Sequence, residues 1–182
     1  MTFAEEYATR LAQWSDVQYC MPWMLERAAR YPDVTVLELG VRSGNSTSAF
    51  LAAAEKNGGR VWSVDTEPPE VPAHWYDSEL WTFLQGDDTT YDIPFGPVMY
   101  DVVFIDTSHH YAHTLTELRR FVPVVKPGGT VLLHDSLLAH VDYEPLPYPV
   151  TLALAAFCDE TGRGWIEHGG RTGFAEITRP NG

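Results

Sequence analysis

Short apolar runs alternate along the chain with longer segments in which apolar residues recur at helical spacing. The runs predict strands near residues 34–39, 60–65, 81–85, 101–105 and 129–134. Continuous apolar strands of this length are typical of a parallel sheet covered on both faces. Amphipathic segments predict helices near residues 3–14, 17–29, 45–56, 111–124 and 149–160.

Two further strands are predicted near residues 164–168 and 173–178, where glycines separate them. Strands joined this closely form a hairpin, which places an antiparallel edge on the sheet. The fold expected is α/β, a doubly wound Rossmann-like sheet of seven strands that is mostly parallel. The length of 182 residues predicts a single domain, with N-terminal helices in residues 1–30 and the core in 31–182.

The first strand leads into a glycine turn, in the sequence ELGVRSGN. Glu38 interrupts the apolar run, and a buried carboxylate needs a partner because burying it alone costs several kcal/mol. Gly40 and Gly44 allow a close approach of the backbone, and residues 45–47 offer side-chain caps for the next helix. The spacing E-x-G-x-x-x-G differs from the G-x-G-x-x-G of dinucleotide sites, which disfavours a pyrophosphate ligand.

Acidic residues also end the next two strands. Asp65 follows the glycine turn by about twenty residues, where an acidic side chain in this architecture binds a ribose diol. Gly86, Asp87 and Asp88 end the third strand. An acidic rim at the carboxyl ends of the strands favours a ligand with a ribose and an amino group but no phosphate.

Five segments resemble the class I S-adenosylmethionine-dependent methyltransferases in the family's order: ELGVRSGNST, VWSVD, LQGDD, DVVFIDTSHHY and GGTVLLHD. The resemblance covers about residues 15–178 and implies S-adenosylmethionine as cofactor. It implies that the glycine turn wraps the methionine end, that Asp65 binds the ribose and that Asp87 lies near the adenine. The cofactor-binding residues expected are Glu38, Gly40, Arg42, Ser43, Gly44, Ser46, Asp65, Thr66, Gly86, Asp87 and Asp106.

Within that family the chain is most similar to the macrolide sugar O-methyltransferases and the cephalosporin hydroxylase-like proteins. In these a strand ending F-I-D is followed by G-x-H-x-Y, whereas here the run is FIDTSHHY, with Thr107 in place of the glycine. The resemblance matches Asp106 and Asp135 to metal-binding acids and His109 to a proposed general base. His134 occupies a position that can be acidic in the group, so the resemblance leaves its role as a ligand open.

The residues themselves suggest the same chemistry. Adjacent parallel strands lie about 5 Å apart. If their strands are neighbours, Asp106 and Asp135 can therefore bind one Mg²⁺ or another divalent cation together. Ser136, a water or the substrate would complete the set of ligands. Methyl transfer to a hydroxyl requires removal of its proton, which a cation and a neutral histidine promote. We therefore expect methyl transfer to a hydroxyl of a small molecule, such as a sugar, with His109 as the base.

Two other classes of function stay open. His109, His134 and one aspartate could form the two-histidine, one-carboxylate ligand set of a non-haem iron oxygenase. A protein that binds S-adenosylmethionine without catalysis is the third class.

Several polar residues near these motifs are expected to be solvated. His110 and His113 begin a helix, and Glu117 lies on the same helix with Arg119 and Arg120. Arg42 is expected to pair either with Glu38 or with a surface acid.

The composition limits the classes of molecule that the protein is expected to bind. A formal net charge of −13 repels phosphate backbones, and the 12 lysines and arginines form no run, so neither nucleic acid nor an anionic membrane is expected. Cys20 and Cys158 form no metal or redox motif, which favours the cytoplasm. We also expect no export signal and no membrane span. The expected partner is a small-molecule acceptor, and both a monomer and a homo-oligomer stay open.

Overall fold

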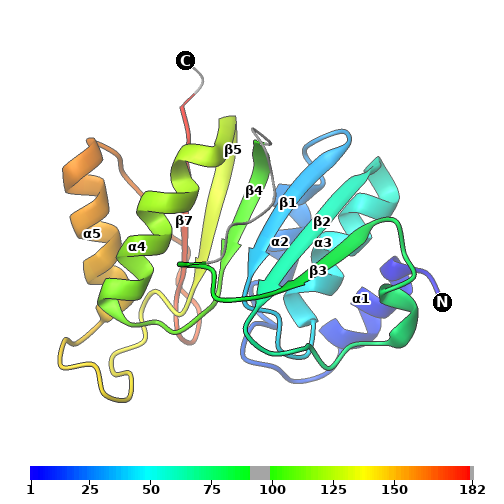
Figure 1. Ribbon diagram of the computed structural model, residues 1–182, viewed down its shortest axis with the longest axis horizontal. Coiled ribbons are helices and arrows are strands. Elements are labelled where there is room, and N and C mark those ends of the chain that lie inside the picture. Colours follow the sequence, from blue (N-terminus) through cyan, green and yellow to red (C-terminus); the bar gives the residue numbers. More distant parts are fainter. Residues whose placement is uncertain (91–98, 181–182) are drawn as a thin grey trace.

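The computed structural model of the protein describes residues 1–90 and 99–180. Its centre is a seven-stranded sheet with the strand order β3-β2-β1-β4-β5-β7-β6 (Figure 1). Strands β1 to β5 pair in parallel, whereas β7 is antiparallel to both β5 and β6. The predicted sheet and its antiparallel edge are therefore confirmed. The strands are β1 (Val34–Leu39), β2 (Gly59–Asp65), β3 (Trp81–Gln85), β4 (Tyr100–Ile105), β5 (Val125–His134), β6 (Ile166–Glu167) and β7 (Phe174–Thr178).

Helices cover both faces of this sheet. On one face α3 packs against α1 and α2, and on the other α4 packs against α5 (Figure 1). The helices are α1 (Phe3–Leu11), α2 (Met21–Ala28), α3 (Asn45–Asn57), α4 (Tyr111–Phe121) and α5 (Pro149–Thr161), with single 3-10 turns η1 (Ala73–Trp75) and η2 (Val122–Val124). In the part of the chain described, none of the helices has both the length and the apolar character needed to cross a bilayer.

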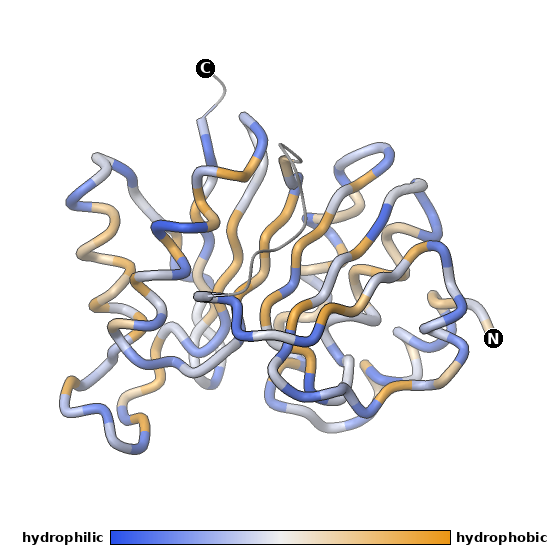
Figure 2. The backbone as a smooth tube through the Cα atoms, in the orientation of Figure 1, coloured by the Kyte–Doolittle hydropathy of each residue, from blue (hydrophilic) through white to orange (hydrophobic). Residues whose placement is uncertain are grey.

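Alternation along the strands divides the core into two layers. Val36 and Phe104 face α1, α2 and α3, while Leu37 and Ile105 face α4 and α5. Successive side chains of a strand point to opposite faces, so a strand covered on both sides is apolar throughout. Figure 2 shows the hydrophobic residues along the central strands and hydrophilic residues in many of the connecting loops.

The start of α3 differs from the prediction. The helix begins at Asn45, and its N-cap is Gly44, which adopts a left-handed conformation and makes no side-chain cap. The capping role expected of residues 45–47 was therefore wrong. Ser46 and Thr47 instead donate hydrogen bonds to the Glu38 carboxylate, because that buried group competes for their hydroxyls.

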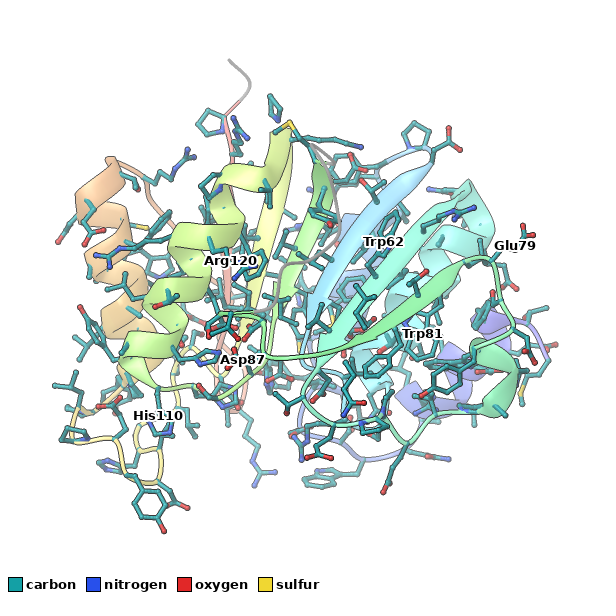
Figure 3. All side chains as sticks on the ribbon, viewed as in Figure 1. Trp62, Glu79, Trp81, Asp87, His110 and Arg120 are labelled. Atoms are coloured by element: carbon teal, nitrogen blue, oxygen red, sulfur yellow. The ribbon has the colours of Figure 1, made fainter. Side chains whose placement is uncertain are left out.

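Parallel strands end at the same edge of a sheet, so β1, β2, β3 and β4 present their last residues together. The connections that leave this edge contain the residues predicted to bind a ligand. Figure 3 shows Asp87 at this edge and His110 nearby at the start of α4.

Candidate functional site

The glycine turn after β1 is held against two neighbouring strands. Gly40 has a φ of 87°, and a Cβ at this position would clash with the carbonyl oxygen of Asp106. Asp65, at the end of β2, accepts the backbone N–H of Val41 at 2.7 Å and that of Arg42 at 3.2 Å. Glycine is required at residue 40 because the ends of β1 and β4 meet there without room for a side chain.

Glu38 lies beneath this turn and is fully buried. Its carboxylate accepts hydrogen bonds from the hydroxyls of Ser46 at 2.6 Å, Thr47 at 2.8 Å and Ser63 at 2.6 Å. Burial raises the pKa of Glu38 to about 7, even though these hydroxyls act in the opposite direction. The predicted need for a partner is confirmed, and the partners are hydroxyls rather than a cation.

Two cavities flank the turn and share Arg42 and Asp106 in their walls. The first has a volume of about 320 Å³, and the predicted residues in its wall are Gly40, Arg42, Asp65, Thr66, Gly86, Asp87 and Asp106. The second, of about 300 Å³, is bordered by Ser43 and Ser46 and by residues 14–17. The sequence contained no motif that marked residues 14–17 as part of a site.

Neither Gly44 nor Glu38 lines either of the two cavities. A side chain at Gly44 would clash with Val71 and Trp75, so its absence lets the loop after β2 pack onto the glycine turn. Arg42 pairs with Asp16 at 2.8 Å rather than with Glu38. This pair links the glycine turn to the segment between α1 and α2.

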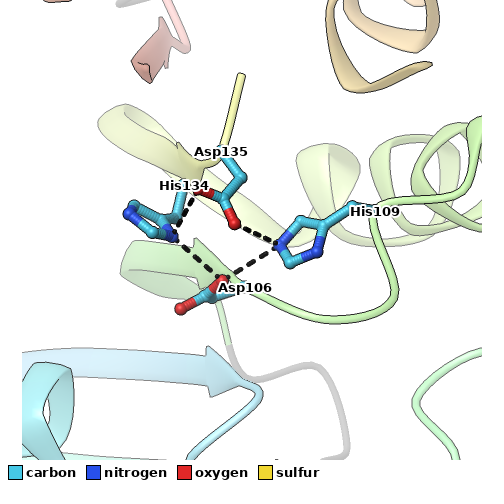
Figure 4. Close-up of side chains that lie close together, drawn as sticks. All are labelled: Asp106, His109, His134 and Asp135. Carbon is cyan, nitrogen blue, oxygen red and sulfur yellow. Dashed lines mark hydrogen bonds and ion pairs between the residues drawn. The ribbon is translucent and has the colours of Figure 1, made fainter. Parts of the chain in front are cut away.

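Four side chains meet where β4 and β5 end (Figure 4). The Nε2 atom of His109 lies 3.1 Å from Asp106 Oδ1 and 3.3 Å from Asp135 Oδ2. The Nδ1 atom of His134 lies 3.2 Å from Asp106 Oδ1 and 3.3 Å from Asp135 Oδ1. The parallel pairing of β4 with β5 brings the two aspartates together, as the sequence predicted.

The cluster is largely shielded from solvent, with the His109 side chain 21% exposed and that of His134 1% exposed. Burial by itself would raise the pKa of Asp106, but hydrogen bonds from His109 and His134 outweigh it and hold this pKa below its ordinary value. Burial would likewise lower the pKa of His134, yet the hydrogen bond and the charge of Asp106 raise it. Asp106 and Asp135 therefore stabilise a positively charged group between the ends of β4 and β5.

This cluster fits a divalent cation. Among the described residues, Asp135 Oδ1 is one of the buried atoms without a hydrogen-bond partner. Oxygen and imidazole ligands of this kind bind Mg²⁺, Mn²⁺ and similar ions. His109 and Asp135 both adopt left-handed backbone conformations, with φ of 59° and 57°. Such strain in residues other than glycine concentrates at functional sites.

The Ser136 hydroxyl has a partner outside the cluster. Ser136 is fully buried, and its hydroxyl donates to Glu167 Oε2 at 2.7 Å. The structure therefore directs this hydroxyl toward β6, because the chain turns after β5 and the hairpin β6–β7 packs beside it.

Two expectations about α4 were wrong. Glu117 is fully buried rather than solvated, and it accepts a hydrogen bond from Thr107 at 2.7 Å. His113 is only 27% exposed and lies 3.1 Å from Asp88. The sequence did contain a signal, because residues four apart share one face of a helix, and Phe121, four residues after Glu117, belongs to the core.

Comparison with known proteins assigns the family. A family model described as a methyltransferase domain matches residues 37–136. A search of curated proteins finds no matching sequence.

Solved methyltransferases share the fold. The S-adenosylhomocysteine-bound methyltransferase PaMTH1 of Podospora anserina is 16% identical, with a TM-score of 0.68 over 99% of this chain and 88% of its own. The O-methyltransferase TomG of Streptomyces achromogenes, in complex with S-adenosylmethionine, is 16% identical, with a TM-score of 0.66 over 98% and 89%.

The mycinamycin-pathway methyltransferase MycE, in complex with Mg, S-adenosylhomocysteine and mycinamycin VI, is 19% identical, with a TM-score of 0.68. The alignment covers 98% of this chain and 53% of MycE, so the chain spans about half of that protein's length. At these identities the three structures establish the fold. Because the family model covers more than half of the sequence and runs from within β1 to the end of β5, the chain belongs to the methyltransferase domain family, with the class I S-adenosylmethionine-dependent methyltransferase fold.

Proposed function

We propose that the protein transfers a methyl group from S-adenosylmethionine to a hydroxyl of a small molecule, with His109 as the base and a divalent cation beside it. The observation that carries this proposal is the position of His109 Nε2, within 3.3 Å of both Asp106 and Asp135. Asp106 also borders the two cavities around the glycine turn. A proton acceptor, a pair of carboxylates and a space for the cofactor therefore lie at one edge of the sheet.

The first cavity supports the choice of cofactor. Asp65 and Asp87 lie in its wall, where carboxylates can accept hydrogen bonds from a ribose diol and an amino group. Among the described residues of this wall, Arg42 is the only arginine or lysine, and its side chain is 75% exposed and paired with Asp16. This arrangement favours a nucleoside without phosphates. Neighbouring structures of the same fold contain S-adenosylmethionine or S-adenosylhomocysteine.

The residues that would hold the cation are Asp106, Asp135 and His134. When bound, such an ion stabilises negative charge on the acceptor oxygen. The two carboxylates orient the His109 ring, whose left-handed backbone turns it toward them. His109 then takes the hydroxyl proton at Nδ1, because its Nε2–H faces the two carboxylates. Positioning of the acceptor against the sulfonium methyl group lowers the barrier further, by roughly 7–11 kcal/mol in favourable cases.

The second cavity is the proposed entry for the acceptor. It shares Asp106 with the first cavity and is bordered by Trp14, a residue that is 77% exposed. An exposed aromatic ring beside a polar cleft suits a partly apolar molecule that carries hydroxyls. A sugar-bearing natural product fits this description, and the neighbouring structure MycE contains mycinamycin VI.

A panel assay tests the proposal. The purified protein is incubated with S-adenosylmethionine, Mg²⁺ and hydroxyl-bearing acceptors, including glycosylated macrolides, sugars and catechols. We expect formation of S-adenosylhomocysteine together with the mass gain of one methyl group on an oxygen of one acceptor class. Cofactor binding without turnover of any acceptor would favour a binding protein. Oxygen consumption with ferrous iron, which the two histidines of the cluster could hold, would favour an oxygenase.

A further inference from the structure

A second group of metal-binding side chains lies apart from the four residues at the ends of β4 and β5. It consists of Asp88, His113 and Glu117, whose ligand atoms lie within 4.8 Å of one another. Asp88 belongs to the connection that follows β3, and the other two lie one turn apart on α4. The group therefore joins two elements that are far apart in sequence.

The contacts within this group place the imidazole against both carboxylates. His113 Nε2 lies 3.1 Å from Asp88 Oδ1 and 3.7 Å from Glu117 Oε1. Thr107, which follows β4, donates to the same Oε1 atom at 2.7 Å. Asp88, Thr107 and His113 also contribute to the wall of the first cavity. The cluster is thus part of the wall of the proposed cofactor site, and Glu117 lies behind that wall.

The remaining carboxylate oxygens of this group lack partners. The Glu117 side chain is 0% exposed and that of Asp88 is 8% exposed. Within the part of the chain that the structure describes, Glu117 Oε2 and Asp88 Oδ2 are buried and accept no hydrogen bond. A buried carboxylate without partners costs several kcal/mol. Two such oxygens in one cluster therefore favour either a shared proton or a bound cation.

The pKa directions agree with these two alternatives. Burial, followed by the neighbouring Asp88, raises the pKa of Glu117 well above its ordinary value. Burial would also raise the pKa of Asp88, but His113 and Glu117 outweigh it and lower this pKa. Without a cation, the pair holds one proton between two oxygens. A divalent ion can replace that proton and let both groups ionise.

We propose that Asp88, His113 and Glu117 form a second divalent-cation site, which fastens the connection after β3 to α4 in the wall of the first cavity. Two carboxylates and one imidazole suit Mn²⁺ or Zn²⁺. The observed spread of the ligand atoms matches an ion bound at about 2.0–2.5 Å from each. The site does not depend on the proposed methyl transfer, because none of its three residues takes part in the chemistry at His109.

Metal titration with separated sites tests the proposal. The full chain is stripped of metal and titrated with Mn²⁺, with bound ion measured by electron paramagnetic resonance. The Asp135→Asn variant, which impairs the cluster at the ends of β4 and β5, is expected to bind one ion. Adding Glu117→Gln should weaken that binding by more than about tenfold, because a charged ligand is lost while the hydrogen bond from Thr107 can be kept. Circular dichroism confirms folding.

A control and a second variant make the result decisive. Glu79→Gln removes an exposed carboxylate at the other end of β3 and should leave the bound ion in place. His113→Gln should weaken binding as Glu117→Gln does, and Mn²⁺ in the Asp135→Asn protein should show coupling to an imidazole nitrogen that His113→Gln removes. Absence of bound Mn²⁺ in a folded Asp135→Asn protein would overturn the proposal, as would equal binding with and without Glu117→Gln. In that case Asp88 and Glu117 share a proton only.

Discussion

Asp65 accepts the backbone N–H of Val41 at 2.7 Å, so the residue predicted to bind a ribose also holds the glycine turn in place. It further accepts the N–H groups of Arg42 at 3.2 Å and Glu67 at 3.1 Å. A carboxylate offers about four acceptor positions. One therefore stays available for a hydroxyl of the ligand, and the three backbone contacts fix the direction in which it points.

Replacing Asp65 is expected to weaken cofactor binding. Asp65→Ala should raise the Kd for S-adenosylhomocysteine about tenfold or more, because loss of a charge-assisted hydrogen bond costs about 1.5–3 kcal/mol. Calorimetry measures the affinity, and thermal unfolding reports on the turn. Asp65→Asn keeps an acceptor for Val41 and should bind the cofactor better than Asp65→Ala. An unchanged Kd in both variants would remove Asp65 from the cofactor site.

Methyl transfer is expected to need a divalent cation. A chelator should abolish turnover and added Mg²⁺ or Mn²⁺ should restore it, because Asp106 and Asp135 present carboxylates on one side of His109. Asp135→Asn should raise the ion concentration required for half-maximal rate. Full activity in excess chelator, or an unchanged ion requirement in Asp135→Asn, would show that the two aspartates serve only to position His109.

His109 is expected to matter for the rate and little for binding. His109→Ala should lower kcat by about a hundred- to ten-thousand-fold, the usual range for loss of a general base, while the Kd for the cofactor stays near that of the wild type. His110→Ala is the matched control, because this adjacent imidazole lies 3.7 Å from Glu144 instead of facing the aspartates. An inactive His110→Ala beside an active His109→Ala would reverse the two assignments.

Glu38 is expected to make stability fall as pH rises. Its pKa is about 7 in the folded protein against an ordinary 4.5, so the folded state binds the extra proton. The stability that this proton confers is fully present below about pH 4.5 and is lost as pH rises through about 7. The change amounts to about 3 kcal/mol at 1.36 kcal/mol per unit.

Urea unfolding of the wild type and Glu38→Gln between about pH 5 and pH 8 measures this effect. The variant cannot titrate at residue 38, so its stability relative to the wild type should increase across the range. Glu79→Gln, on the surface, should follow the wild type. Parallel pH profiles for Glu38→Gln and the wild type would show that Glu38 stays ionised in the folded protein.

The order of strands and helices was predictable because each element carries its own periodicity. The run over β1 is buried on both faces, and its bounds at Val34–Leu39 agree with the predicted range. The ends of α2 and β5 were harder to place. Strand β5 begins at Val125, before a lysine, a proline and two glycines that interrupt the apolar pattern. Pairing of Tyr100 with Val125 extends the strand there, which only the neighbouring strand β4 decides.

The sequence by itself determined that Asp106 and Asp135 stand at the ends of strands, because apolar runs and their polar ends are local features of the chain. Tertiary structure alone decided which strands are neighbours and therefore that His109 and His134 contact both carboxylates. It also decided that Glu117 is buried beside Asp88, since the helix periodicity shows which residues share a face but not what that face packs against. Contacts between distant segments depend on the packing of the whole chain, and local patterns do not encode them residue by residue.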